Sequence, residues 1–293
     1  MYVQIKALID EFESRLILFS VIEPGHLGWS AEIKRLGASR VLEGLMAGDY
    51  GAKRCSTLLK KIDHTNVDML HGVINACDSE FIYPGHRKWP TQLDQLSNPP
   101  IGLIVKGDLK CLSEKSIAIV GTREPTESGL KNARNFSSRF AKHGWHVVSG
   151  GAIGIDSAAH SGALRAGGKT IAVIASGVDV DYPPVNSELF KKIPTHGALV
   201  SEVMPYVRAQ QNRFLTRNRI IAALSCATLV VEAAYRSGSL RTARDASDLM
   251  RPVLAIPGPL ESPMSEGCHR LIAEHAAEIV VSEQDAVEFV GVN

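Results

Sequence analysis

The sequence predicts an α/β fold, in which a doubly wound, mostly parallel sheet follows a small all-helical domain. Short β-branched runs alternate with helical patterns through the last two thirds of the chain. Runs this apolar are typical of strands that are covered on both faces, and the repeated strand, helix, strand order implies parallel strands joined by right-handed crossovers. A chain of 293 residues is also too long for one small core, so we expect two domains.

Residues 1 to 75 are predicted to form the small helical domain. Apolar side chains recur there at helical spacing, for example at Leu16 and Phe19. Residues 76 to 100 are rich in turn residues and poor in periodicity, which indicates a connecting segment. The large domain, which carries the sheet, is then expected to cover residues 101 to 293.

Within the large domain, strands and helices are expected to alternate. The short apolar runs predict strands at residues 101–105, 117–120, 146–149, 170–174, 198–201, 228–231, 253–256 and 279–281. The segments between them predict helices at 127–143, 156–166, 186–193, 217–225, 239–249, 268–276 and 283–290. Ligands bind such sheets beyond the carboxyl ends of the strands, so we expect the functional residues at that edge.

Composition excludes several classes of protein. With 45% hydrophobic and 22% charged residues the chain is an ordinary globular protein, and a net charge of +1 means that any basic site must be local. The cysteines are odd in number and never spaced C-x-x-C, which supports neither a disulfide framework nor a zinc knuckle. The start, MYVQIKALIDEFESRL, does not look like a signal peptide, and no run is long enough for a membrane helix. We therefore expect a cytoplasmic protein.

The first candidate binding element is the glycine-rich turn SGGAIGIDSAAH at 149–160. Gly150 and Gly151 would let a phosphate approach backbone N–H groups and the positive end of the following helix. The glycines could equally serve only a tight turn and close helix packing. We assign Gly154 and Asp156 to shaping the loop, with Asp156 as a dipole partner at the start of the helix.

The second candidate is the basic segment RAQQNRFLTRNR at 208–219. Four arginines fall within it and no acidic residue occurs between Glu202 and Glu232. Arginine forks onto phosphate oxygens, while Phe214 and Asn218 could stack on or hydrogen-bond to bases, as single-strand binding requires. The alternative is a solvated helix start with Phe214 in the core, but the acid-free stretch beside a glycine-rich sheet edge favours binding.

The third candidate follows the strand predicted at 228–231. The hydroxyl and amide groups of Ser237, Gly238 and Ser239 precede a predicted helix, so they can cap it and receive an anion, although capping alone would explain Ser239. Glu232 can anchor a neighbouring loop. Histidines lack companions at metal-ligand spacing, so we predict no metal and no cofactor.

Seven segments resemble, in order and spacing, the DNA-processing protein A family, also called DprA or Smf. They are VGTREPTESG, VVSGGAIGIDSAAHSGAL, DYPPVN, FLTRNRIIAALS, LVVEAAYRSGSLRTARDA, VLAIPGP and SEGCHRLI. The N-terminal stretch RLILFSVIEPGHLGWSAEIKRLGASRVLEGL and the later WPTQLDQL are similar to that family's helical domain, often described as sterile-alpha-motif-like. The resemblance covers nearly the whole chain and implies an extended Rossmann-like fold.

The resemblance also implies a function. It implies a non-enzymatic protein that binds and protects single-stranded DNA without strict sequence preference, forms a homodimer, and helps to load the RecA recombinase during natural transformation or recombination. Carried over by motif, the residues expected to line the DNA pocket are Arg123, Arg213, Phe214, Arg217, Asn218, Arg219, Ser237, Gly238 and Ser239.

Three departures from the family pattern stand out. Many relatives carry Arg in the glycine-rich turn where this chain has Ile153, and many show Asn-Phe-Pro where it has Arg213-Phe214-Leu215. The charge of the loop is therefore expected to be redistributed. The chain also ends at Asn293 without the winged-helix domain that many relatives carry, which puts functions resting on that domain in question.

Two enzymatic alternatives compete with DNA binding. Related Rossmann-like folds include nucleoside monophosphate phosphoribohydrolases, and Glu232 is expected at a strand end where such enzymes place an acid. No clear base, nucleophile or metal cluster accompanies it. A nicotinamide-dependent oxidoreductase is suggested by fold alone, and Gly150-Gly151-x-x-Gly154 is not the G-x-G-x-x-G spacing. DNA binding is the favoured hypothesis.

Overall fold

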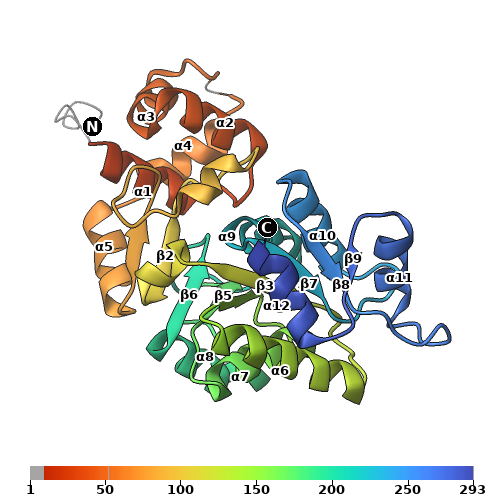
Figure 1. Ribbon diagram of the computed structural model, residues 1–293. Coiled ribbons are helices and arrows are strands. Elements are labelled where there is room, and N and C mark those ends of the chain that lie inside the picture. Colours follow the sequence, from red (N-terminus) through yellow and green to blue (C-terminus); the bar gives the residue numbers. More distant parts are fainter. Residues whose placement is uncertain (1–9, 52, 293) are drawn as a thin grey trace.

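The structure, a computed structural model, describes residues 10–51 and 53–292 (Figure 1). A group of helices at the N-terminal end packs against one edge of a large sheet, and further helices cover both faces of that sheet. The first residues of the segment on which the signal-peptide prediction rests, 1–9, lie outside the described residues. None of the described helices is long and apolar enough to cross a bilayer.

The N-terminal region is helical, as predicted. Its helices are α1 (Glu11–Val21), α2 (Leu27–Leu36), α3 (Ala38–Ala47), α4 (Ser56–Asp63) and α5 (Val67–Ala76). The Asp10 side chain caps α1 by accepting the N–H of Glu13 at 2.7 Å. The Glu11 carboxylate accepts the N–H groups of Ala38 and Ser39, each at 3.0 Å, and so fastens α1 to the positive end of α3.

The sheet is mostly parallel, which confirms the predicted fold class. The described residues form nine strands, in the spatial order β1-β2-β6-β5-β4-β3-β7-β8-β9. The pairs β1–β2 and β2–β6 are antiparallel, and the others are parallel. The strands are β1 (Glu80–Ile82), β2 (Leu103–Gly107), β3 (Ser116–Val120), β4 (His146–Ser149), β5 (Thr170–Ile174), β6 (Gly197–Ser201), β7 (Ala227–Val230), β8 (Val253–Ala255) and β9 (Glu278–Ile279).

Helices cover the sheet on both sides, so alternate residues of each strand enter different cores. In β3, Ile117 and Ile119 pack with α6 (Glu127–Lys142), α7 (Ile155–Arg165) and α12 (Glu283–Val292). Ala118 and Val120 face the opposite core, which contains α9 (Gln211–Leu224), α10 (Ser239–Asp248) and α11 (Glu266–Ala273). Helix α8 (Ser187–Lys192) joins the core shared with the N-terminal helices. This burial on two faces explains the continuous apolar runs of the strands.

Two elements differ from the sequence prediction. Strand β1 lies inside the segment 76–100 that was expected only to connect, and the same segment buries Trp89, Leu93 and Leu96 in the core. A strand of three residues among turn residues leaves no periodic pattern to detect. Helix α9 begins at Gln211 rather than near 217, so most of the basic segment is helical. The division of the chain into domains stays a prediction.

The order of the strands reverses direction at the middle of the sheet. From β3, the chain proceeds outward through β4, β5 and β6 on one side, and through β7, β8 and β9 on the other. The loops that follow β3 and β7 therefore leave the same edge of the sheet in opposite directions. Such a switch point opens a crevice at the carboxyl ends of the strands, where ligands bind in folds of this kind.

Candidate functional site

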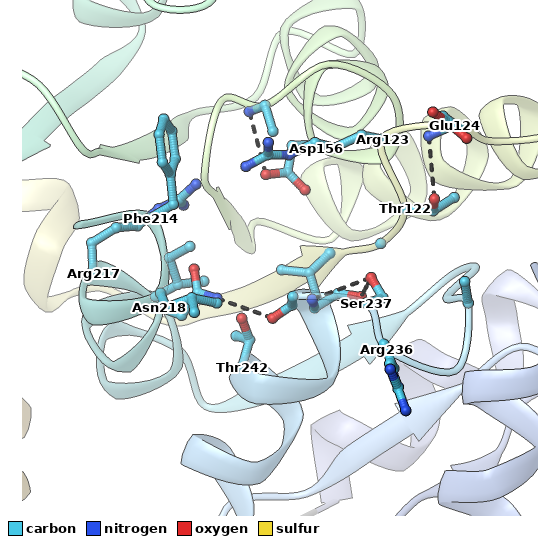
Figure 2. A pocket seen from close by; sticks show the side chains of 18 residues that line it. Thr122, Arg123, Glu124, Asp156, Phe214, Arg217, Asn218, Arg236, Ser237 and Thr242 are labelled. Carbon is cyan, nitrogen blue, oxygen red and sulfur yellow. Dashed lines mark hydrogen bonds between the residues drawn. The ribbon is translucent and has the colours of Figure 1, made fainter. Parts of the chain in front are cut away.

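A pocket of about 430 Å³ lies at this switch point (Figure 2). It is formed by the loops after β3, β4 and β7 together with α9 and the start of α10. Figure 2 shows the α9 residues, the loop residues and the first residues of α10 converging on the hollow from three directions. Its lining is Val120, Gly121, Thr122, Arg123, Glu124, Ala152, Asp156, Phe214, Leu215, Arg217, Asn218, Ile221, Ala234, Arg236, Ser237, Gly238, Ser239 and Thr242.

Arg217 is the central charged group of this pocket. The residue is only 6% exposed, and neither its Nε nor one of its terminal nitrogens, NH1, has a hydrogen-bond partner. Burial lowers the pKa of the guanidinium to about 10, so it still carries its charge at neutral pH. Buried donors without partners are costly, and an anion in the pocket would supply the missing acceptors.

Gly150 makes room for the arginine. A Cβ atom placed on Gly150 would lie 1.7 Å from Arg217 NH1 and 2.2 Å from its Cζ, so the guanidinium occupies the space that any larger residue would fill. Gly151 has a φ of +69°, where a Cβ would also meet the ring of Phe190 at 2.6 Å. The glycine-rich turn therefore shapes the pocket because Gly150 and Gly151 have no side chains to fill this space.

Asp156 closes the same turn from the start of α7. Its Oδ2 accepts the N–H of Gly150 at 3.1 Å and that of Ala152 at 3.4 Å. Gly154 precedes α7 with a φ of +86°, and a Cβ there would stand 2.5 Å from the carbonyl oxygen of Thr122. Burial raises the pKa of the Asp156 carboxyl although Arg217 opposes that shift.

We expect Asp156 to make anion binding stronger at lower pH. Its native pKa is above the ordinary value of 3.8, so the native state takes up this proton more readily than the unfolded chain. Above its raised pKa, the ionised Asp156 carboxylate therefore lowers the stability of the native state. This destabilisation is lost as the pH falls through that pKa. Protonation also removes a negative charge beside Arg217. At constant ionic strength, the affinity of the protein for a polyanion should therefore rise as the pH falls through the raised pKa of Asp156.

The matched variant for this pH effect is Asp156→Asn, which keeps an oxygen to accept the N–H groups of the turn. Fluorescence anisotropy with a labelled oligonucleotide should show a flatter pH dependence in the variant than in the unchanged protein. Equal pH dependences would assign the effect to other groups.

Aromatic and hydroxyl groups complete the pocket. The Arg123 guanidinium lies 5.1 Å from the centroid of the Phe214 ring, and the centroid of the Tyr182 ring lies 5.5 Å from that of Phe214. This arrangement joins a cation to an aromatic surface on which a base can stack. At the start of α10, the hydroxyls of Ser237 and Ser239 are 2.7 Å apart, and the positive end of the helix dipole faces the pocket.

Asn218 fastens α9 to the start of α10. Its side-chain amide donates to the carbonyl oxygen of Gly238 at 3.1 Å. This bond links the helix that carries Arg217 to the loop that carries the serines, so the two walls of the pocket keep a fixed separation.

Three of the four arginines of the basic segment, Arg208, Arg213 and Arg219, are not among the residues that line the pocket. Arg219 forms a buried, bidentate ion pair with Glu202, at 2.8 and 2.6 Å. Arg213 forms a second bidentate pair with Glu23, with Nε and NH2 donating at 2.7 and 2.8 Å, and this pair lowers the pKa of Glu23. Arg213 and Arg219 connect parts of the fold, and their assignment to DNA stays a prediction from the sequence.

We expect the pair of Glu23 and Arg213 to stabilise the contact between the N-terminal helices and α9. Because Glu23 is 45% exposed, the coupling between the two side chains should be about 1 kcal/mol or less. Urea unfolding of Glu23→Gln, Arg213→Gln and the double variant gives this coupling. Additive losses of stability in the double variant would show that the pair contributes nothing. Arg213→Gln should weaken anion binding far less than a change of Arg217.

Glu232 is hydrogen-bonded to a neighbouring loop. Its carboxylate accepts the N–H of Thr126 at 2.9 Å and the Thr126 hydroxyl at 2.6 Å, just before α6. It is not among the residues that line the pocket. Within the described ranges, no three His, Cys, Asp or Glu side chains are placed to hold a metal ion.

Sequence reasoning missed several residues of the site. Thr122, Arg236 and Thr242 line the pocket, and Tyr182 contacts Phe214 from outside the lining. Arg236 offered a signal, since it directly precedes the predicted Ser237–Ser239 site. The position of Tyr182 depends on a contact between residues 32 positions apart in the chain, which no local pattern reveals.

The comparisons with known proteins agree on one family. The model of the DNA recombination-mediator protein A family matches residues 80–291. A Mycobacterium tuberculosis protein described as a putative DNA processing protein DprA is 47% identical over 180 residues, 61% of this chain and 46% of its own length. DNA processing protein DprA of Streptococcus pneumoniae is 41% identical over 199 residues, 68% of this chain and 70% of its own length. The chain thus spans about half the length of the first curated relatives that it matches.

Two solved structures are similar to this fold, one over nearly the whole chain and one over about two thirds of it. The X-ray structure of DNA processing protein A from Streptococcus pneumoniae has a TM-score of 0.83 at 32% identity and covers 96% of this chain and 98% of its own. DNA processing protein A from Helicobacter pylori, described with a single-stranded DNA binding mode, has a TM-score of 0.64 at 31% identity. It covers 70% of this chain and 92% of its own.

Proposed function

Because the chain belongs to the DNA recombination-mediator protein A family, we propose that it binds single-stranded DNA and that the pocket around Arg217 holds the strand. Arg217 and the amides at the start of α10 receive a phosphate, and Arg123 contributes a second positive charge. Phe214 offers the aromatic surface for a neighbouring base. Gly150, Gly151, Gly154 and Asp156 keep the turn beneath the phosphate in shape.

The observation that carries this proposal is the unpartnered, buried guanidinium of Arg217. A fold does not maintain a buried charge with unmade hydrogen bonds for stability alone, because a partner or an apolar residue would serve better. The guanidinium faces a pocket rather than a packed core. A phosphate oxygen fits these donors in both geometry and charge.

The pocket favours a single strand over a duplex. Arg217 lines the pocket with only 6% of the residue exposed, so a phosphate that reaches it must enter individually with its neighbouring bases unstacked. A duplex holds its bases away from side chains such as Phe214. Single-strand sites of this type combine positive charge with aromatic platforms and tolerate many sequences.

The test is a titration of labelled single-stranded and duplex oligonucleotides of equal length across a salt series. We expect preferential binding of the single strand and a linear fall of log affinity with log salt concentration. Equal affinity for both forms, or an affinity independent of salt, would contradict the proposal. Nucleoside monophosphates serve as competitors, and release of free base from them would favour the hydrolase instead.

We further propose that the protein is a cytoplasmic mediator of recombination and not an enzyme. The family description supports a role in recombination, and helping RecA to load onto bound single strands is the step that such a mediator would perform in natural transformation. The hydrogen bonds that Glu232 accepts from Thr126 support a non-enzymatic role, because they hold this candidate acid outside the pocket. RecA filament assembly on coated single strands should accelerate when this protein is added, and no acceleration would count against the role.

A homodimer is the proposed assembly. Several late residues of the large domain expose apolar side chains, namely Met250, Leu260, Ile279 and Val281. Ile279 belongs to β9, the last strand of the sheet, and an open strand edge with apolar side chains favours association. Light scattering at micromolar concentration should give the mass of a dimer; a monomer mass would contradict this part of the proposal.

A further inference from the structure

A second cavity adjoins the pocket around Arg217. It measures about 470 Å³ and lies between α10, α11 and the loop after β7. Its walls include Tyr235, Arg236, Arg241, Arg244, Arg270 and Glu274, and we call it the arginine groove. The two cavities share Leu215 and the loop residues Arg236, Ser237 and Gly238. The two cavities are therefore adjacent, and these shared residues lie between them.

The groove carries more positive charge than its own residues neutralise. Four arginines line it together with one glutamate. Arg241 pairs with Asp245 at 2.8 Å and Arg270 with Glu274 at 3.2 Å. Arg236 and Arg244 form no ion pair within the part of the chain that the structure describes. Such a lining attracts a polyanion.

The groove also presents an aromatic ring beside these charges. Tyr235 is 43% exposed. The Arg270 guanidinium lies 4.4 Å from the centroid of its ring, and that of Arg236 lies 6.0 Å from it. Figure 2 shows the Arg236 side chain pointing away from Asp156 and Arg123, and Arg236 also lines the groove. The combination of cations and an exposed ring repeats that of Arg123 and Phe214 in the first pocket.

We infer that the arginine groove is a second subsite, which binds the continuation of the same DNA strand. The inference rests on the proposed function, because it assigns the polyanion in the groove to the strand held at Arg217. Single-strand sites span about 4 to 16 nucleotides, whereas the first pocket has the volume of a small-molecule site. The strand passes over the loop at Arg236 and then lies along α10 and α11, with Tyr235 as its stacking surface.

Oligonucleotide length separates the two subsites. We would compare oligothymidylates of about 4 and about 16 nucleotides, the limits of the usual site size. The variant is Arg244→Gln with Arg270→Gln, two exposed side chains whose loss leaves the core intact. The control is Arg165→Gln, an exposed arginine at the C-terminal end of α7, which is the end away from the pocket. Circular dichroism verifies that all variants are folded.

The inference predicts that the double variant binds the long strand roughly tenfold more weakly and that its salt slope falls by about one unit for each arginine. Binding of the short strand should not change. If the double variant matches Arg165→Gln for the long strand, or loses the short strand equally, the second subsite is wrong. Failure of the proposed function gives a different result, in which a change of Arg217 leaves both lengths bound as before.

Discussion

Replacing Arg217 by methionine should reduce the affinity for single-stranded DNA by about 10- to 150-fold. Hydrogen bonds to charged groups are worth about 1.5–3 kcal/mol, and each 1.4 kcal/mol corresponds to about a factor of ten in affinity. The loss should be equal for different sequences, because a phosphate contact carries no base information. Fluorescence anisotropy with labelled oligothymidylate and with a mixed sequence measures both quantities.

The same substitution should have little effect on stability without DNA. Two opposing effects follow from the loss of the guanidinium. Its unmade hydrogen bonds at Nε and NH1 disappear, which favours the variant, while the Asp156 carboxyl loses the positive charge that lowers its pKa. Arg217→Lys keeps the charge without the planar fork and should bind with intermediate affinity. An Arg217→Met variant that is unfolded would contradict this account, since the residue would then be structural.

Gly150→Ala should weaken DNA binding nearly as strongly as Arg217→Met, although it removes no charged group. The new methyl group would lie 1.7 Å from NH1 of Arg217 and 2.1 Å from NH2, so the guanidinium must move. Gly150 does not have a positive φ, and alanine therefore causes no backbone strain at this position. The expected loss acts entirely through the displaced arginine.

A double variant tests this mechanism. If alanine at position 150 acts by displacing Arg217, then Gly150→Ala should add nothing once Arg217 is methionine. Gly72→Ala is the matched control, since this glycine lies within α5 and a Cβ there meets nothing within 4 Å. It should leave DNA binding unchanged. Additive losses from the changes at 150 and 217 would show that Gly150 acts in another way.

The fold could be predicted from the sequence because its signals are local. Apolar runs long enough to be buried on both faces, separated by amphipathic helices, specified the parallel strands. Strand β1 was not predicted because its three residues, Glu80 to Ile82, are too short a run to show alternation. They pair with β2 through a contact that forms only in the folded chain. The early start of α9 was not predicted because its first three residues, Gln211 to Arg213, are polar or basic and no side chain caps the helix.

The site was predicted only in part, because charge partners are not local. The acid-free stretch between Glu202 and Glu232 suggested four free arginines, but the partner of Arg213 is Glu23 in the N-terminal region. The partner of Arg219 is Glu202, at the boundary of that stretch. Arg217 differs from both only in what the fold brings near it. No sequence pattern separates a paired arginine from an unpaired one.

Two of the departures from the family pattern, Ile153 and Leu215, place exposed apolar side chains near the site. Ile153 is 41% exposed in the glycine-rich turn, and Leu215 is 53% exposed between the two cavities. Neither side chain carries a charge. The cations that line the two cavities are Arg123, Arg217 and the arginines of the arginine groove.

The most direct test of the account is a crystal structure of the protein with a short oligothymidylate. We expect a phosphate oxygen within hydrogen-bond distance of Nε or NH1 of Arg217, with a base near the ring of Phe214. A strand that is bound elsewhere on the protein while these two nitrogens remain without a DNA partner would contradict the central claim.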